Sequence, residues 1–438
     1  MNNALSLDSL LTYFNLSNNA IGSSLWWNNL TKCEGPFIKA QEGDDYRVLF
    51  IWQDPEGGKG SSTTSSVILN VNGLTNHNTW QPTCLIRYSD SDLWFTYLDI
   101  NDKWRGSYSF IPIKDNQLPQ FVKQQSDGSR NTQRRWWLEV VKQQVVDPLN
   151  SKPPIASGWG LNSPLHLPNA PRELGWHEWD KGKLTNLPIA GNINFTWFAE
   201  QLDNQRQCTL FSTATCKAPL VILLDGEKWG ADSGMLSVLQ YLTNINKLTP
   251  AHYLLIPSID SKTRWQELSC SEPFWQAITE QLLPQVASQL LPSEQSITEY
   301  IVAGQSLGGL SALYAGTHFP TYFTKMISLS GSCWWPEIER MQDPDAYQLK
   351  HPDWDKIAPK NSLADRVSNG EVSVSGLHIY QTVGNAEKQL SIYNALHYEI
   401  FKQNGANITY QEVDGGHDWL SWRSSLINGL VSLLPPQV

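Results

Sequence analysis

A serine flanked by glycines is the residue whose surroundings most directly indicate chemistry in this chain. Residues 304–308 read G-Q-S-L-G, with Ser306 at the centre, and a further glycine, Gly309, follows. This G-x-S-x-G pattern is typical of a nucleophile elbow, a tight turn that strains the serine backbone and tolerates no bulk two positions away. Ser306 is therefore predicted to be a nucleophile. An ordinary glycine-rich turn with an incidental serine is the alternative.

The residues on either side of this turn predict the elements that must position it. EYIVAG, which ends at residue 304, has the apolar character of a buried strand, and LSALYAG, residues 310–316, indicates a closely packed helix. This strand-to-helix context is the one that the motif requires. The N–H of Leu307 would lie at the start of the helix and donate to the oxygen of a reacting ester.

A serine nucleophile needs a base, and His417 is the histidine best placed to be one. The segment DGGHDW follows a predicted strand, NITYQEV, and precedes a predicted helix, WLSWRSSLINGLVSLL. From such a position after a strand, a histidine can reach back to the nucleophile. The other eight histidines are expected to be structural; they are His77, His166, His177, His252, His318, His351, His378 and His397.

The third member of a triad would be a carboxylate between the serine and the histidine in chain order. Glu387 is favoured because it follows the predicted strand GLHIYQTVG by a short turn. Asp414 and Asp418 are the rivals, since both are close to His417 in sequence. Glu387 could instead be a solvated carboxylate at a helix start.

A second oxyanion donor is expected from the turn after an earlier strand. The segment VILLDGEKW supplies such a turn, and the N–H of Glu227 would donate beside that of Leu307; an ordinary Asp-Gly turn is the alternative. The sequence contains no H-E-x-x-H motif, no EF-hand loop and no Cys/His cluster, so no metal site is expected.

The second half of the chain alternates apolar strand candidates with longer helical stretches. APLVILLDG, AHYLLIPSID, ITEYIVAG and KMISLSGS are apolar throughout, which favours a parallel sheet covered by helices on both faces. Ligands bind beyond the carboxyl ends of the strands in such sheets. The predicted class is α/β, with an α/β-hydrolase catalytic domain.

The first part of the chain has a different pattern. Short β-branched or aromatic runs separated by turn-forming residues predict a β-sandwich; they are YRVLFIWQD, SSVILNVNG, DLWFTYLDI and GSYSFIPI. Residues 147–187 are rich in Pro and Gly and show neither helical nor strand periodicity. We therefore expect a β-sandwich domain over 1–150, a connector over 151–187 and the catalytic domain over 188–438.

Composition excludes several classes of protein. The chain of 438 residues is 40% hydrophobic and 17% charged, as in folded globular proteins. Its net charge of −10 and its lack of any Lys/Arg block argue against nucleic-acid binding. The six scattered cysteines are expected to be free thiols, and the N-terminal residues resemble neither a signal peptide nor a membrane span. A cytoplasmic location without membrane association is expected.

With these residues in place, the chain resembles the enterochelin (ferric enterobactin) esterase family over nearly its whole length. The matching segments occur in the family's order; they are FIWQDPEG, LNVNGLTNHN, WRGSYSFIPI, SPLHLPNAP, LLDGEKW, the R-x-x-E-L of residues 264–268, AGQSLGGLSALYAG, LSGSCWWP and VDGGHDWLSWR.

The resemblance implies an immunoglobulin-like N-terminal domain and a catalytic domain of the esterase D type. It implies hydrolysis of the serine trilactone of a ferric catecholate siderophore to dihydroxybenzoylserine units in the cytoplasm. No cofactor is implied, because the iron enters with the substrate. Ser306 and His417 match the family's nucleophile and base, and Glu387 matches a carboxylate at the equivalent turn, although some members are described as using a Ser-His dyad.

The implied substrate gives a reason to single out three further residues. An iron tris-catecholate is trianionic, so Arg264 could bind it, with a surface salt bridge as the alternative. Trp334 and Trp335 could form a wall on which catechol rings stack. Two features depart from the family pattern and leave substrate preference open: NAEKQL after Gly384 lacks an arginine, and the loop from Gly60 to Ser66 looks inserted.

Two other functions are compatible with parts of the sequence. A carbohydrate esterase, such as a feruloyl or acetyl esterase, could use a tryptophan-rich β domain to bind polysaccharide, although the expected cytoplasmic location argues against it. A non-catalytic siderophore-binding protein would not need Ser306 and His417. Acyl transfer to an acceptor other than water is also compatible with the fold. The oligomeric state is not predicted.

Overall fold

The computed structural model describes residues 5–41, 43–157, 160–184, 192–230, 233–292, 295–337 and 358–435. The chain forms two compact units. The first contains Met1–Pro171 and a short later segment, Asp414–Ser421; the second contains Arg172–Val413 and Trp422–Val438. No helix among the described residues is both long enough and apolar enough to span a lipid bilayer.

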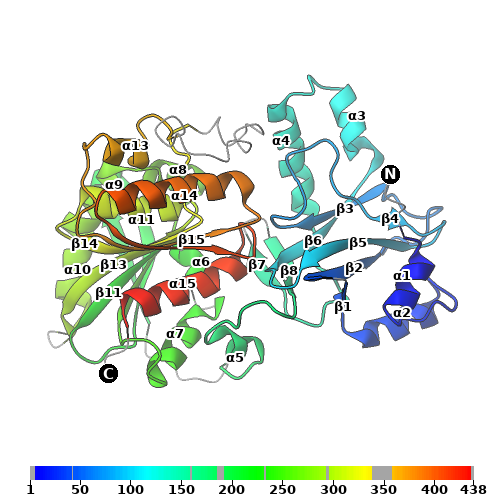
Figure 1. The fold of residues 1–438 in the computed structure, drawn as a ribbon, viewed down its shortest axis with the longest axis horizontal. Helices are drawn as coiled ribbons and strands as arrows, with labels where there is room; N and C mark the ends of the chain where they lie inside the picture. Colours follow the sequence, from blue (N-terminus) through cyan, green and yellow to red (C-terminus); the bar gives the residue numbers. More distant parts are fainter. Residues whose placement is uncertain are drawn as a thin grey trace. The chain divides into compact units, whose positions relative to one another are not determined.

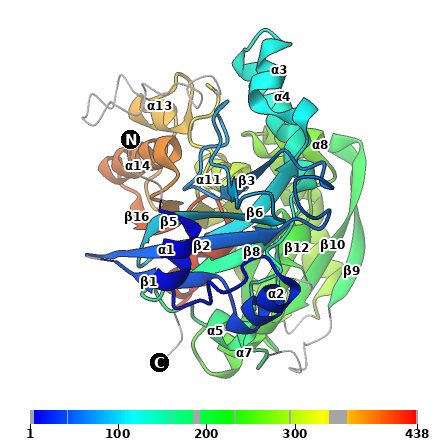
Figure 2. The ribbon, with the colours of Figure 1, turned by 90° about the vertical axis from the view of Figure 1, so that its right-hand side faces the viewer.

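The first unit is built on two four-stranded antiparallel sheets (Figures 1 and 2). In spatial order, one sheet contains β1 (Phe37–Ala40), β2 (Asp45–Gln53), β5 (Leu93–Asn101) and β4 (Ile86–Arg87). The other contains β3 (Ser66–Val71), β6 (Arg105–Ile113), β8 (Gly160–His166) and β7 (Ile155–Ser157). Each of the four runs predicted to be strands forms one, namely β2, β3, β5 and β6.

The strand pattern of the first unit follows from burial on both faces. Alternate residues of β2 and β3, such as Phe50 and Leu69, pack into one shared core. The intervening residues pack outward: Ile51 contributes to a cluster with the first helices, and Ile68 to one with Trp137. The helices of this unit are α1 (Leu7–Tyr13), α2 (Ser24–Leu30), α3 (Pro119–Gln124) and α4 (Arg130–Val140), with short 3₁₀ turns at Thr31–Cys33, Asp115–Gln117 and Val141–Gln143.

Sequence periodicity did not predict β7 and β8, which lie within the Pro- and Gly-rich residues 147–187. β8 reads GLNSPLH, and Gly, Asn and Pro have low strand propensity. Its hydrogen bonds to β6, with Arg105 opposite His166 and Ser107 opposite Pro164, make it a strand. Pairing with a distant strand, rather than local preference, therefore determines this part of the fold.

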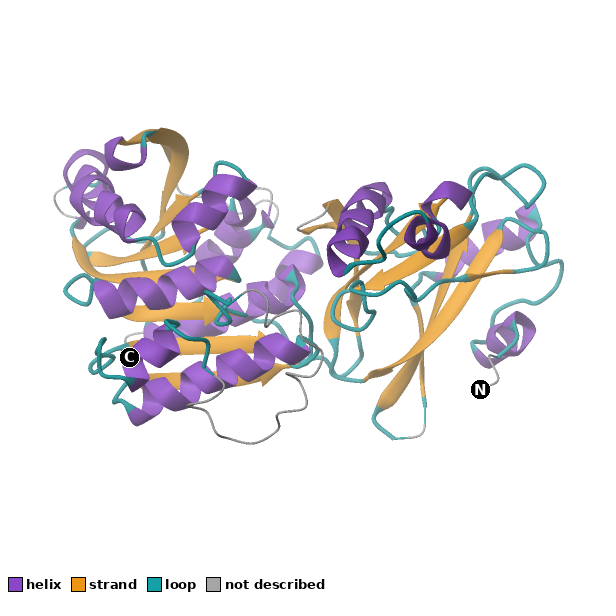
Figure 3. Cartoon of the chain, turned by 90° about the horizontal axis from the view of Figure 1, so that it is seen from above, coloured by secondary structure: helices purple, strands orange, loops and turns teal. Residues whose placement is uncertain are grey.

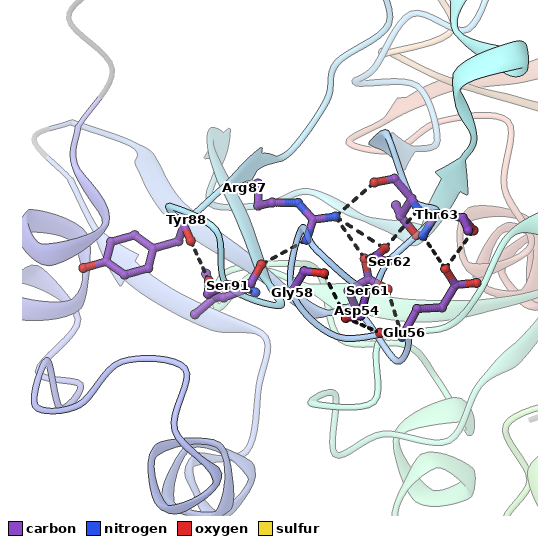
Figure 4. A network of polar contacts seen from close by, with 11 residues as sticks. Asp54, Glu56, Gly58, Ser61, Ser62, Thr63, Arg87, Tyr88 and Ser91 are labelled. Atoms are coloured by element: carbon purple, nitrogen blue, oxygen red, sulfur yellow. Dashed lines mark hydrogen bonds and ion pairs between the residues drawn. The ribbon is translucent and has the colours of Figure 1, made fainter.

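The loop between β2 and β3, which contains the segment that looked inserted, is held by a polar network (Figure 4). The buried Asp54 accepts a hydrogen bond from Ser62 Oγ at 2.6 Å and pairs with Arg87 Nη2 at 3.2 Å. Arg87 Nη2 also donates to Thr64 O at 3.0 Å, and Glu56 Oε2 accepts from Thr63 N at 2.6 Å. The loop is thus tied to β4 through one arginine.

The second unit contains one eight-stranded sheet. Its spatial order is β16 (Asn407–Val413), β15 (His378–Gly384), β14 (Phe323–Leu329), β13 (Ile297–Gln305), β11 (Ala218–Leu224), β12 (His252–Ile256), β10 (Asn204–Ser212) and β9 (Ile193–Ala199). The six strands from β16 to β12 are parallel, and β10 and β9 join antiparallel at one edge. Every residue of β11 and β12 is buried, as the predicted parallel sheet requires.

Helices lie along this sheet (Figures 1 and 3), with α14 (Lys388–Gln403) and α15 (Trp419–Leu433) on opposite faces (Figure 1). The helices are α5 (Trp176–Asp180), α6 (Gly226–Trp229), α7 (Met235–Asn244), α8 (Ser261–Leu268), α9 (Glu272–Ala277), α10 (Leu283–Gln285), α11 (Leu307–His318), α13 (Leu363–Ser368), α14 (Lys388–Gln403) and α15 (Trp419–Leu433). A 3₁₀ turn covers Glu200–Leu202, and π-helical turns cover Ile278–Leu282 and Val286–Leu290. The second unit thus has the α/β architecture that the sequence predicts.

Candidate active site

The turn that carries Ser306 joins β13 to α11, so the predicted strand-to-helix context is confirmed. Ser306 has φ 57° and ψ −120°, a strained conformation for a residue with a side chain. Its N–H donates to Leu329 O at 2.9 Å, and its C=O accepts from Ser332 N at 2.9 Å. Hydrogen bonds to and just beyond the end of the neighbouring β14 therefore hold the strained residue in place.

Sterics explain the glycine two positions before the serine. A Cβ atom at Gly304 would lie 2.4 Å from the carbonyl carbon of Gly308, a distance that non-bonded atoms do not reach. The turn can therefore close only if residue 304 is glycine. The hydroxyl that it presents, Ser306 Oγ, lies 3.5 Å from Ser332 Oγ.

Glu387 lies just beyond the carboxyl end of β15, at the start of α14. Its Oε1 accepts hydrogen bonds from Ser330 Oγ at 2.5 Å and from Gly384 N at 2.8 Å. Ser330 Oγ in turn accepts from Trp422 Nε1 at 2.9 Å. Because β13, β14 and β15 are adjacent and parallel, Ser306, Ser330 and Glu387 all follow strand ends at the same edge of the sheet. The structure thus brings Glu387 to the edge that carries the nucleophile.

His417 belongs to the segment Asp414–Ser421, which groups with the first unit, whereas Ser306 and Glu387 belong to the second. The preceding strand, β16, ends at Val413 beside the end of β15, where Asn385 N donates to Val413 O at 2.9 Å. His417 therefore comes four residues after the end of β16 in the chain, and β16 ends at the sheet edge where β13 and β15 also end. Its pairing with Ser306 stays a prediction.

The two predicted oxyanion donors lie in the first turns of helices that follow adjacent parallel strands. Leu307 follows β13, and Glu227 lies in α6 directly after β11. Ser258 N donates to Glu227 Oε2 at 2.9 Å, and burial, followed by the nearby charge of Asp225, raises the pKa of the Glu227 carboxyl. The positions suit the predicted role, which stays a prediction.

Arg264 lies in α8 and makes an ion pair with the buried Asp225. This is the salt bridge that the sequence left open, although the arginine side chain is only 27% exposed. Asp225 also accepts from Gln305 Nε2 at 2.8 Å and from Ser258 Oγ at 2.7 Å. One carboxylate therefore links α8, the turn after β11 and the residue before the nucleophile. A role for Arg264 in binding substrate stays a prediction.

Trp334 and Trp335 belong to a cluster of three indoles. The third is Trp265, which follows Arg264 on α8 and is 37% exposed. Its ring centroid lies 6.0 Å from that of Trp334 and 5.5 Å from that of Trp335. Trp334 itself is buried. Sequence reasoning missed Trp265, although its place inside the R-x-x-E-L segment was available as a signal. The cluster offers aromatic surface suited to flat rings.

Within the described part of the chain, none of these site residues belongs to a group of three or more His, Cys, Asp or Glu side chains that could hold a metal ion. The polar groups at the site are hydroxyl, carboxylate, guanidinium and backbone N–H groups. Such a set suits acyl transfer through a serine. The expectation that no metal or cofactor takes part stays a prediction.

Two family models match the chain, one in its N-terminal part and one in its C-terminal part. Residues 47–176 match the family described as "Enterochelin esterase, N-terminal", and residues 200–433 match the family described as "Putative esterase". The second match alone covers more than half of the chain.

Individual proteins resemble the chain over nearly its full length. The iron(III) enterobactin esterase of Dickeya dadantii strain 3937 is 34% identical over 96% of this chain and 94% of its own. That of Escherichia coli K12 is 34% identical over 95% and 97%. The crystal structure of the enterobactin esterase from Shigella flexneri, determined in the presence of enterobactin, has a TM-score of 0.76 at 32% identity and covers 94% of this chain and 98% of its own. That of the ferric enterobactin esterase from Salmonella typhimurium has a TM-score of 0.77 at 32% identity, with coverages of 94% and 98%.

Proposed function

Because this chain belongs to the family of iron(III) enterobactin esterases and is a carboxylic ester hydrolase, we propose that it hydrolyses the trilactone of ferric catecholate siderophores. The products would be dihydroxybenzoylserine units, and the iron would enter as part of the substrate rather than as a resident cofactor. The observation that supports this best is the strained Ser306 turn, found in a chain 34% identical to such esterases over almost its whole length.

The proposed mechanism is acyl transfer through Ser306. His417 takes the proton of Ser306 Oγ, and the oxygen attacks the carbonyl carbon of a lactone ester. The N–H groups of Leu307 and Glu227 stabilise the oxyanion of the tetrahedral intermediate. When the intermediate collapses, the ester C–O bond breaks and His417 gives the proton to the departing serine hydroxyl. Water, deprotonated by His417, then releases the product carboxylate and regenerates Ser306.

Glu387 is proposed to orient the imidazole of His417 and to stabilise its charged form. Its hydrogen bonds from Ser330 and Gly384 fix the position of the carboxylate at the sheet edge that carries Ser306, which supports the role. Of the two rivals, Asp418 already accepts hydrogen bonds at both oxygens, from Ser107 at Oδ2 and from Leu420 at Oδ1. A dyad without an acid remains the alternative.

Substrate binding is proposed to use charge and aromatic surface beside the nucleophile turn. Arg264 would attract the trianionic ferric complex, and Trp334 and Trp335 would contact its catechol rings. We add Trp265 to this set because it packs against both tryptophans and is the most exposed of the three that form the cluster.

The remaining expectations concern the domains of the chain, the cellular location of the reaction and the cofactor. An immunoglobulin-like fold for the N-terminal domain is supported by its two four-stranded antiparallel sheets. The division into a β-sandwich domain over 1–150, a connector over 151–187 and a catalytic domain over 188–438 stays a prediction, although β7 and β8 within the predicted connector belong to a sheet of the first unit. Iron release in the cytoplasm and the absence of a cofactor are proposed with the substrate.

Product analysis tests the proposed function. The enzyme is incubated with iron-loaded enterobactin, iron-free enterobactin and, in parallel, a feruloyl ester, and the products are identified by mass spectrometry. We expect linear trimer, dimer and monomer from the siderophore, and none with Ser306→Ala. Cleavage of the feruloyl ester alone would select a carbohydrate esterase, and tight siderophore binding without cleavage would select a binding protein.

A further inference from the structure

The segment that carries His417, Asp414–Ser421, makes specific contacts with the rest of the first unit, Met1–Pro171, which we call the β domain. Arg105 N, at the start of β6, donates to Asp414 O at 2.9 Å. Asn72 Nδ2, in the turn after β3, donates to His417 O at 2.7 Å. These bonds join residues more than 300 positions apart in the chain, and they lie on both sides of the glycine pair that precedes the histidine.

The residue after the histidine is held more deeply. Asp418 is 2% exposed, and its Oδ2 accepts hydrogen bonds from both the N–H and the hydroxyl of Ser107. Its Oδ1 accepts from Leu420 N at 2.8 Å, within its own segment. A buried carboxylate is costly unless donors surround it, so these bonds strongly favour one position for the peptide after His417.

The residue before the histidine lies against the same turn of the β domain. A Cβ at Gly416 would lie 2.6 Å from Asn72 O and 3.0 Å from the Cα of Gly73. Only glycine permits this close approach of the two backbones. The His417 backbone is therefore bounded by Gly416 on one side and Asp418 on the other, and both contact the β domain.

Asn72 and Ser107 are themselves linked. Asn72 N donates to Ser107 O at 3.1 Å, so the turn after β3 is tied to β6. The Ser107 side chain is fully buried, and its hydroxyl accepts from Asn162 Nδ2 at 3.0 Å. The two residues that contact the histidine segment are thus tied to each other, and Ser107 is tied further to β8 through Asn162.

We propose that Asn72 and Ser107 are positioning residues for catalysis, through which the β domain sets the location of the His417 backbone. The inference rests on the proposed role of His417 as the base. A general base works only within hydrogen-bond reach of its proton, and displacement by about 1 Å can cost about a hundredfold in rate. The β domain is then part of the catalytic machinery and not only a support for folding or a binding surface.

The test replaces Asn72, which is only partly buried, by Ala and by Asp. Both substitutions remove the Nδ2 donor to His417 O, and Asp does so with almost no change in side-chain shape. Asn76→Ala, an exposed change in the same turn, is the matched control. Three quantities are measured: kcat and KM for the siderophore, the rate at which a small fluorophosphonate modifies Ser306, and the melting temperature. The fluorophosphonate needs an activated serine but no siderophore binding site.

We expect Asn72→Ala and Asn72→Asp to lower kcat by about tenfold to a hundredfold. The fluorophosphonate rate should fall in parallel, with KM within about twofold of wild type and with Asn76→Ala unchanged. Normal kcat and normal fluorophosphonate rates in both Asn72 variants would overturn the proposal, whatever their melting temperatures. A rise in KM alone would also overturn it. Failure of the proposed function shows separately, as full activity in Ser306→Ala.

Ser107→Ala provides a second variant, because it removes the hydroxyl but keeps the N–H bond to Asp418. It should lower kcat and the fluorophosphonate rate together, and Ser107→Cys, which keeps a weak donor, should restore part of the loss. If Ser107→Ala lowers only the melting temperature, Ser107 serves folding alone and its assignment is withdrawn.

Discussion

Arg264 and Asp225 form a two-point ion pair, with Nε 2.6 Å from Oδ1 and Nη2 2.8 Å from Oδ2. The same carboxylate accepts a hydrogen bond from Gln305, the residue before the nucleophile. Asp225 also directly precedes the turn that contains Glu227. The ion pair therefore connects both turns that the proposed mechanism uses to stabilise an oxyanion.

Asp225→Asn should lower kcat by about tenfold to a hundredfold for the ferric siderophore and for a small neutral ester alike, because misplaced oxyanion donors affect both substrates. Steady-state kinetics with the two substrates measure this. Glu371→Gln, which removes a more exposed partner of Arg366, is the control and should change neither.

Arg264→Met separates the two roles of the arginine. If Arg264 only holds Asp225, both substrates should lose activity in kcat. If it binds the trianionic complex, KM should rise for the ferric siderophore and stay unchanged for the neutral ester.

Ser306→Ala and His417→Ala should each reduce turnover by about four to six orders of magnitude, and the double variant should lose little more because the two residues act as one unit. Burst and steady-state assays measure the losses, with Ser373→Ala as an exposed control in the second unit. Near-normal turnover in either single variant would refute the assignment of that residue as the nucleophile or the general base.

Glu387→Ala should reduce kcat by about a hundredfold to ten-thousandfold, less than Ser306→Ala, because an orienting acid is less essential than the nucleophile. The kcat values of Glu387→Ala and Asp414→Ala are compared under one set of conditions. A larger loss in Asp414→Ala would transfer the acid role, and retained activity in both would indicate a dyad.

His397 should make the protein less stable in mild acid. It is 1% exposed in α14, its Nδ1 lies 3.1 Å from Tyr393 O, and burial lowers its pKa to about 4. The unfolded chain takes up a proton near the ordinary pKa of 6.5, whereas the folded protein does not until about 4. The free energy of unfolding should therefore fall as pH falls from about 6.5 to 4, by about 3 kcal/mol from this residue.

Denaturant unfolding at several pH values measures that slope. His397→Asn keeps a donor for the Tyr393 carbonyl but cannot titrate, so it should flatten the dependence between pH 4 and 6.5. The exposed His378→Asn is the matched substitution at a surface histidine. An equal slope in His397→Asn and wild type would contradict the prediction.

Local patterns were enough to predict much of this protein. The elbow around Ser306 was predictable because its constraint lies within five residues, as the 2.4 Å approach at Gly304 shows. The buried parallel strands, such as β11, and the sandwich strands, such as β2, were predictable because burial on a sheet face imposes a periodic or wholly apolar sequence.

The rest depended on contacts between segments far apart in the chain. β8 is a strand because it pairs with β6, Arg264 is an ion-pair partner because Asp225 lies beside it, and the backbone of His417 is held by Asn72. None of these contacts could be predicted from the sequence, because none produces a periodic or local sequence pattern and each residue has many possible partners in the chain. By itself the sequence determined the type of chemistry and the elements that carry it. The tertiary structure alone decided which distant side chains hold those elements, since only folding brings them within hydrogen-bond distance.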